Sequence, residues 1–125
     1  MSVNIIDGVG PIVTAKITGE LSRADVTLIQ TAARQAIQRC GKISALFFLD
    51  QFRGWKTEPG WGDMTFLNEH DKNIAKIAIV GETRWKDDVC AFLAKGFRSA
   101  AVEYFLPSEP YKARQWLKAS AAKMP

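Results

Sequence analysis

The sequence predicts an α/β fold, with a mostly parallel sheet of about five strands and about four helices packed on it. The first observation is a short, almost unbroken apolar run, Ile43–Leu49, which stops at Asp50. A run this rich in aromatic and branched residues is typical of a central strand covered on both faces. The second observation is that strand and helix patterns alternate after this run. Such alternation requires crossover connections and therefore parallel strands.

The composition predicts a single domain over residues 1–125. A chain of 125 residues with 47% hydrophobic content can form a hydrophobic core and bury roughly two-thirds of the surface that the unfolded chain exposes. Neither disulfides nor a structural metal is then required for folding. No linker rich in Gly, Ser or Pro, no internal repeat and no low-complexity segment divides the chain.

The individual elements follow from periodicity, capping residues and glycines. In the first half of the chain the sequence predicts a hairpin of strands Val3–Ile6 and Pro11–Thr18, ended by Gly19, then a helix from Ser22 to Gly41 and the central strand. After the central strand it predicts a helix over Trp61–Lys72, a strand over Lys76–Val80, and a helix capped by Thr83 with apolar residues from Trp85 to Phe97. The last two predicted elements are a strand over Ala101–Leu106 and a helix opened by Ser108 and Pro110. Ser22 and Asp25 have the spacing of a capping box. Gly41 is typical of a helix C-terminus.

The charges predict an ordinary solvated surface. The net charge is +4, but no run of five or more like charges occurs, so we expect no nucleic-acid partner and no dedicated anionic-lipid patch. No stretch approaches the roughly 20 apolar residues of a membrane span, and Met1–Asn4 does not begin a secretory signal. Cys40 and Cys90 match no metal or redox spacing and are expected to be reduced thiols. We therefore expect a cytoplasmic protein.

Groups for enzymatic chemistry are sparse. His70 is the only histidine, so neither a histidine-based triad nor a zinc site has its parts. It lies between Glu69 and Asp71 on a surface predicted to be polar. Gly8-Val9-Gly10 is followed by no lysine-serine pair and no helix, which excludes a phosphate loop. We expect a non-catalytic protein with no metal and no cofactor.

Four segments that together span nearly the whole chain carry a resemblance to a known family. They are Ala15–Asp25, Asp50 followed by Phe52-Gly54-Trp55, Ile77–Gly81 with Trp85 after it, and Tyr104-Phe105 to Ala113-Trp116-Leu117. They resemble the SpoIIAA-like proteins, small bacterial proteins similar in fold to STAS domains and to lipid-binding CRAL-TRIO domains. The resemblance implies a five-stranded sheet with helices on it. The likeness to CRAL-TRIO domains implies a small apolar ligand, collected from or delivered to a membrane.

The resemblance also bears on phosphorylation. STAS proteins that antagonise anti-sigma factors carry a phosphorylatable serine in the turn after the central strand. Here the corresponding residues read Asp50-Gln51-Phe52-Arg53-Gly54-Trp55, with no hydroxyl group. We therefore expect no phosphorylation switch at this place.

Tryptophans beside glycines predict a binding site after the central strand. Trp55 and Trp61 flank Pro59 in a turn-rich segment, where such residues either pack in the core or mark an interaction surface. Ligands of open α/β sheets gather beyond the carboxyl ends of the strands. The predicted lining residues are Phe52, Trp55, Trp61, Met64, Leu67 and Trp85, with Arg53 or Lys56 at the mouth to meet a carboxylate or phosphate head group.

Two functional hypotheses follow from this surface. The first is a binding module for a small hydrophobic molecule or lipid, in which the Trp61–Lys72 helix acts as a mobile lid. The second is a protein-interaction module, in which the same surface docks a partner or a second copy of the chain as a homodimer. Peripheral membrane contact is a weaker extension of the first, because the predicted lid helix carries Asp63, Glu69 and Asp71 where interfacial helices are usually lysine-rich.

Overall fold

The fold is built on a five-stranded sheet whose strands lie in chain order. The computed structural model describes residues 3–7, 11–62, 65–93 and 99–119. The strands are β1 (Val3–Asp7), β2 (Ile12–Leu21), β3 (Ile43–Trp55), β4 (Ile74–Val80) and β5 (Ala101–Phe105), in the order β1-β2-β3-β4-β5. β1 is antiparallel to β2, and the other three pairs are parallel. The predicted hairpin and mostly parallel sheet are confirmed.

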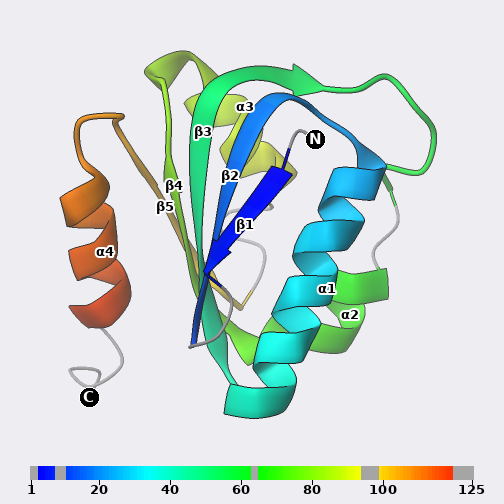
Figure 1. Ribbon diagram of the computed structural model, residues 1–125, viewed down its shortest axis with the longest axis vertical. Helices are drawn as coiled ribbons and strands as arrows, with labels where there is room; N and C mark the ends of the chain where they lie inside the picture. Colours follow the sequence, from blue (N-terminus) through cyan, green and yellow to red (C-terminus); the bar gives the residue numbers. More distant parts are fainter. Residues whose placement is uncertain (1–2, 8–10, 63–64, 94–98, 120–125) are drawn as a thin grey trace.

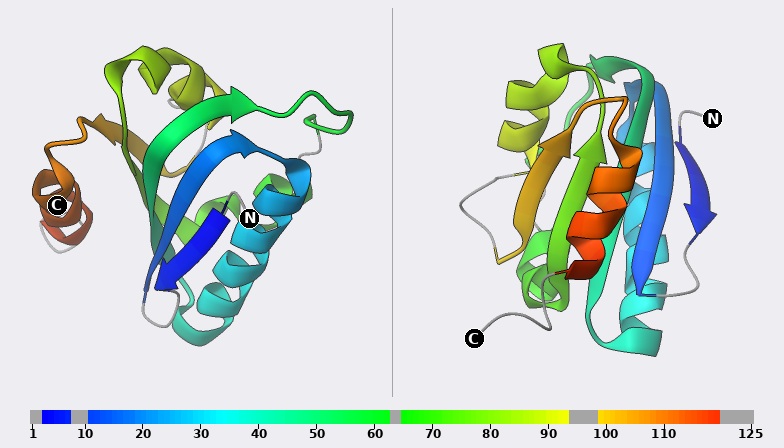
Figure 2. Two further views of the ribbon diagram at one scale, coloured as in Figure 1. Left: turned by 45° about the horizontal axis from the view of Figure 1, so that its top comes forward. Right: turned by 90° about the vertical axis from the view of Figure 1, so that its left-hand side faces the viewer.

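Helices cover both faces of this sheet (Figure 1). On one face lie α1 (Arg23–Cys40), α2 (Thr65–His70) and α3 (Lys86–Phe92). On the other face α4 (Pro110–Ala119) packs on β3, β4 and β5 (Figure 2). Right-handed crossovers between strands that follow one another across a sheet place all their helices on the same face. This rule explains why α1, α2 and α3 share a layer and α4 stands apart.

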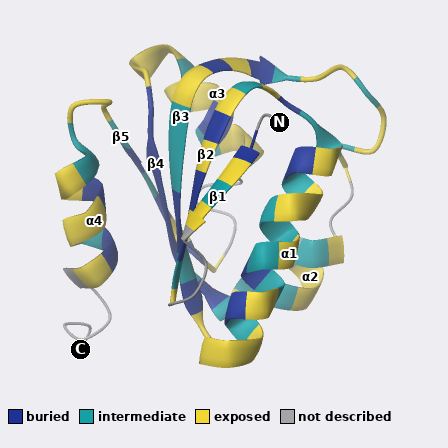
Figure 3. Ribbon diagram, viewed as in Figure 1, coloured by how far each residue is buried: buried dark blue, intermediate teal, exposed yellow. Residues whose placement is uncertain are grey.

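The core has two layers, because strand side chains alternate between the two faces of the sheet. Figure 3 shows buried residues along β4 and on the side of α4 that faces the sheet. On the side of α1, α2 and α3, Val13 and Ile77 are buried in the larger cluster. On the side of α4, Leu46 and Ala78 pack with Leu117. β4 is buried at six of its seven residues, as expected of a strand covered on both faces.

The predicted ends of β2 and β3 are wrong. β2 continues past Gly19 to Leu21, and β3 continues past Asp50 to Trp55. The two extensions stay paired, although the register shifts twice near Gly19. Gln51, with φ 54°, lets β3 bend without leaving the sheet, as irregular strands commonly do. The residues predicted to form a turn after the central strand therefore belong to the strand itself.

The predicted helix over Trp61–Lys72 is shorter in the structure. Trp61 lies in a turn, α2 begins at Thr65, and a 3-10 turn, Asp71–Asn73, follows α2 directly. Glycine and proline before Trp61 disfavour helical backbone there.

Two predicted helix caps are also wrong. Thr83 opens a 3-10 turn that ends at Trp85, and α3 begins at Lys86 without a side-chain cap. Before α4, the Glu109 carbonyl accepts from the Ala113 N–H at 3.2 Å, so Glu109 takes the position predicted for Ser108. The predicted helical residue Phe97 lies outside the described residues.

α1 has both of its predicted ends. The Ser22 hydroxyl accepts from the Asp25 N–H at 3.1 Å, and the Asp25 carboxylate accepts from the Ser22 N–H at 2.9 Å. Gly41, with φ 82°, ends the helix and donates to the Ile37 carbonyl at 2.7 Å. These contacts fix the helix that forms one wall of the candidate site.

Candidate functional site

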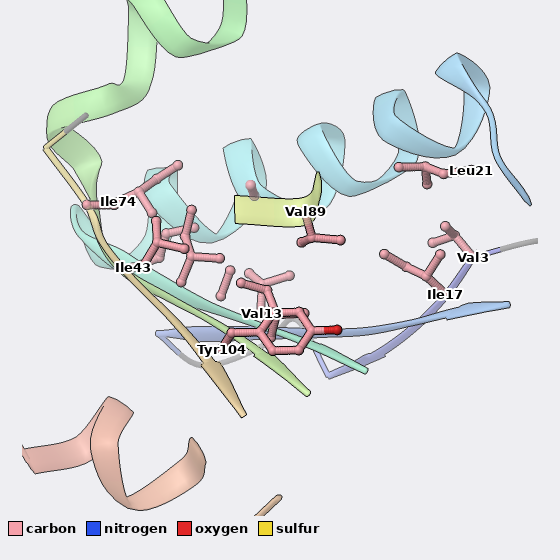
Figure 4. Packing of buried hydrophobic residues seen from close by; sticks show 14 of the residues in the cluster. Val3, Val13, Ile17, Leu21, Ile43, Ile74, Val89 and Tyr104 are labelled. Carbon is pink, nitrogen blue, oxygen red and sulfur yellow. The ribbon is translucent and has the colours of Figure 1, made fainter. Parts of the chain in front are cut away.

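A cavity of about 400 Å³ lies between the sheet and the layer formed by α1, α2 and α3. Its sheet side is apolar, and Figure 4 shows the extent of that surface. Ile43 and Ile74 lie at one end of it and Leu21 at the other, with Val89 of α3 between them. Ala33 of α1 lines the opposite wall. The cavity is therefore bounded by the sheet on one side and by α1 on the other.

The cavity reaches the surface beside α1. Four of its described lining residues are exposed, among them Thr27 of α1, Gly60 in the segment after β3, and Thr65 of α2. Phe92 of α3 also lines it and is 42% exposed. A ligand can therefore enter between α1 and the segment that leads from β3 to α2.

An aromatic cluster occupies the end of the cavity nearest Leu21. Phe52 is its buried centre and meets Trp55 and Trp85 edge-on, with ring centroids 5.3 and 4.9 Å away. Phe92 contacts Trp55 at 5.2 Å and Trp61 at 5.7 Å. Edge-to-face pairs of this kind add about 0.5–1.5 kcal/mol beyond the area they bury. The cavity is therefore closed at this end by tightly packed aromatic side chains.

The indole N–H groups of the cluster differ in their partners. Trp61 donates to the Lys56 carbonyl at 3.0 Å. The buried Nε1 atoms of Trp55 and Trp85 have no hydrogen-bond partner in the described part of the chain. A buried donor left unpaired costs about 1–3 kcal/mol. Both nitrogen atoms are enclosed by surrounding side chains, so the aromatic cluster bears this cost twice.

The segment that follows β3 is fastened to the start of α1. The Lys56 N–H donates to the Leu21 carbonyl at 2.8 Å, and Glu58 accepts from the Arg23 N–H at 2.9 Å. Gly60 has a φ of 96°, and a Cβ atom there would lie 2.2 Å from Nη1 of Arg23. These contacts hold the rim of the cavity at the N-terminus of α1.

The structure brings most of the predicted aromatic residues together. Phe52, Trp55 and Trp61 line the cavity. Trp85 contacts the Phe52 ring but is not among the described residues that line the cavity. Outside the described structure lie Met64 and the side chain of Leu67.

The predicted mouth residues Arg53 and Lys56 are exposed and do not line the cavity. Arg53 follows Phe52 in the strand, and side chains alternate between faces, so it points away from the face that Phe52 shares. Among the described residues, the charged ones that line the cavity are Arg23 and Arg34 of α1. Neither arginine was predicted as a lining residue, because the prediction was drawn from the aromatic residues after the central strand.

A signal for these residues is nevertheless present in the sequence. Arg23, Thr27, Gln30 and Arg34 recur every three or four positions, which places them in one stripe along α1. All four line the cavity. The stripe borders the apolar face of the helix, and this border forms the mouth.

Other groups that could carry chemistry lie apart from the cavity lining. The His70 ring contacts the Phe66 ring at 5.0 Å, and its Nε2 is 3.9 Å from Glu69. Cys40 and Cys90 are free thiols. Over the residues described, no three His, Cys, Asp or Glu side chains gather to hold a metal. Within the same ranges, no helix has the length and apolar character needed to cross a bilayer.

Comparison with known proteins identifies the family. The model of the SpoIIAA-like family matches residues 12–118. The chain belongs to the SpoIIAA-like family. The matched range of this SpoIIAA-like protein runs from the start of β2 into the last turn of α4, and therefore includes every element that lines the cavity.

A solved structure shares the fold of this chain. A crystal structure of an uncharacterised DUF3478-family protein with a SpoIIAA-like fold, from Shewanella loihica PV-4, is similar with a TM-score of 0.66 and 20% identity. The similarity covers 85% of this SpoIIAA-like chain and 83% of the other. At this identity it shows the fold alone. Among curated proteins, none matches.

Proposed function

We propose that this SpoIIAA-like protein binds a small apolar or lipid-like molecule between its sheet and α1, α2 and α3. The cavity of about 400 Å³ carries the proposal. Sites for small molecules typically enclose about 300–1,000 Å³ and combine apolar walls with a few polar groups. The cavity has both features, with an apolar sheet surface and a polar stripe on α1.

The surface of this space supports an apolar occupant. Its sheet side is formed by apolar side chains such as Val13, Ile77 and Ile79, which offer water few hydrogen-bond partners. Moving apolar surface out of water is worth roughly 25 cal/mol per Å² buried. A ligand with an apolar body therefore gains free energy when it displaces water from this space.

The lining residues favour binding over catalysis. Among the described residues that line the cavity there is no carboxylate, imidazole or thiol. General acid–base and nucleophilic mechanisms rely mainly on such groups. The proposed activity is therefore carriage or sensing of the ligand.

Titration with uncharged 1-alkanols of increasing length tests the proposal, with tryptophan fluorescence as the signal. Trp55 and Trp61 line the cavity, so binding should change their emission. We expect the affinity to rise about fourfold per added methylene until the cavity is filled. Trp116 packs on the other face of the sheet, so Trp116→Phe should leave the fluorescence response intact while Trp55→Phe weakens it. An affinity independent of chain length, with no molecule retained in native mass spectrometry, contradicts the proposal.

Protein interaction is the second candidate, and Phe92 favours it. This side chain is 42% exposed and stands beside Trp61 at the mouth, where a partner could anchor on it. Light scattering of the wild-type protein and of Phe92→Ala tests this role. A dimer that Phe92→Ala dissociates, together with no response to alkanols, favours interaction over carriage.

A further inference from the structure

The charges in the cavity wall indicate the class of ligand. Among the described lining residues only Arg23 and Arg34 are charged, and both are cations on α1. Charge complementarity selects partners of opposite sign. A mainly apolar cavity with cations at its rim therefore suits an amphiphile with an apolar body and an anionic head.

Arg34 is the cation with unused donors. Its guanidinium lies 5.1 Å from the centre of the Phe66 ring, and its Nη2 is 3.9 Å from the Glu69 carboxylate, beyond hydrogen-bond distance. Within the described residues, these are its contacts, and neither occupies its five N–H donors. Arg23 has further partners of its own. The free hydrogen-bonding capacity of the cavity rim is therefore at Arg34.

Gln30 adds a second donor beside Arg34. It is half-buried and lines the cavity, and its side chain makes no hydrogen bond in the described part of the chain. Residues four apart on a helix lie on the same side, separated by about 6 Å along the axis. A guanidinium with a neighbouring amide can hold both oxygens of a carboxylate. The nearby Glu69 carboxylate favours a singly charged head over a doubly charged phosphate.

We propose that the ligand is a single-chain amphiphile with a carboxylate head, a long-chain fatty acid in the simplest case. The carboxylate binds to Arg34 and Gln30, and the chain lies over the apolar side of the sheet. This inference rests on the proposed function and adds the ligand class and the residues that receive its head group.

A fatty acid and the 1-alkanol of the same chain length test the inference, because they differ only in the head group. Arg34→Gln should weaken fatty acid binding by about tenfold and change alkanol binding by less than about twofold. Arg53→Gln removes an exposed arginine that does not line the cavity, so it should change neither. In the wild type, added salt should weaken the acid and spare the alkanol.

A variant expected to bind more tightly excludes simple structural damage. Glu69→Gln removes the carboxylate beside Arg34 and should raise fatty acid affinity about threefold, with alkanol affinity unchanged. Equal losses for both ligands in Arg34→Gln overturn the inference, as does an acid-specific loss in Arg23→Gln instead. In both cases alkanol binding by the wild type would still support the proposed function. Failure of both ligands to bind the wild type overturns the proposed function itself.

Discussion

At the scale of single residues, Gly60 shows how closely the cavity mouth is built. Its φ of 96° is a conformation that L side chains rarely adopt, and Arg23 occupies the place where a Cβ atom would stand. Arg23 in turn belongs to the polar stripe of α1. Glycine at this position therefore allows the left-handed backbone conformation and leaves room for the Arg23 guanidinium.

We predict that Gly60→Ala lowers the free energy of unfolding by about 1–2 kcal/mol, because left-handed backbone disfavours a Cβ atom. Urea denaturation measures the loss. Gly62→Ala is the matched control: its Cβ atom would meet nothing within 4 Å and its φ is not positive. We expect that control to stay within about 0.5 kcal/mol of the wild type. Equal losses in the two variants would contradict the prediction.

We predict that ionisation of Tyr104 lowers the free energy of unfolding at alkaline pH. Burial, aided by Cys90 and Glu82, raises the pKa of Tyr104 from 10.0 to about 12. Its hydroxyl donates to the Glu82 carbonyl at 2.6 Å. Because the folded state favours the neutral phenol, this stabilisation is complete below pH 10 and is lost as the pH rises from about 10 to 12.

The variant Tyr104→Phe tests this assignment. Below pH 9 it should be less stable than the wild type by about 1 kcal/mol, the usual worth of one hydrogen bond. Above pH 10 the difference should shrink, because the variant has no phenol to ionise at this position. Urea denaturation at pH 9 and pH 11.5 measures both effects. The same pH dependence in both proteins would refute the assignment.

At the scale of elements, α1 is the one whose ends the sequence states most clearly. Its capping box joins residues only three positions apart, so local sequence is enough to predict it. We predict that Ser22→Ala costs about 1 kcal/mol of unfolding free energy. Ser108→Ala is the control, because Ser108 is exposed and makes no hydrogen bond among the described residues. A Ser22→Ala loss no larger than that of Ser108→Ala would argue against a stabilising cap.

The end of β3 was harder to predict, because its signals are those of a turn. Asp50 and Gly54 are typical of chain reversals, yet β3 passes through both and remains paired with β2 as far as Trp55. The pairing is decided by β2, some thirty positions earlier in the chain, and by the positive φ angles of Gln51 and Gly54. Local sequence contains neither piece of information.

The candidate site likewise contains residues that the local sequence predicts and residues that it does not. Trp55 and Trp61 were predicted as lining residues because large apolar side chains beside glycine and proline are conspicuous. Arg34 and Gln30 were not, because polar residues on a helix are by default assigned to solvent. What brings them to the cavity is the packing of α2 beside α1, visible in the contact between Arg34 and Phe66.

At the scale of the whole molecule, the cavity allows a ligand to bind but lowers the stability of the ligand-free protein. A space kept for a ligand is a space that core side chains do not fill, and proteins commonly give up stability at such sites. Ala33 and Ala36 of α1 allow a direct comparison. Ala33 lines the cavity, whereas Ala36 is fully buried and does not.

We predict that Ala33→Leu raises the stability of the ligand-free protein by about 1–2 kcal/mol by filling the cavity. The same change should weaken alkanol binding at least tenfold. Ala36→Leu should instead destabilise the protein by about 1–3 kcal/mol, because that site is already packed. Thermal unfolding and the fluorescence titration measure both variants. Destabilisation of equal size in the two would show that the space beside Ala33 cannot accept a side chain.

The order of the strands has a kinetic consequence. Each strand lies beside the one made just before it, so no pairing waits for a distant part of the chain. Loop-closure entropy grows with the length of chain to be closed, and here each closure spans a single connection. The hairpin, α1 and β3 can therefore assemble while later residues are still being synthesised on the ribosome. β5 and α4 then join a sheet that already exists.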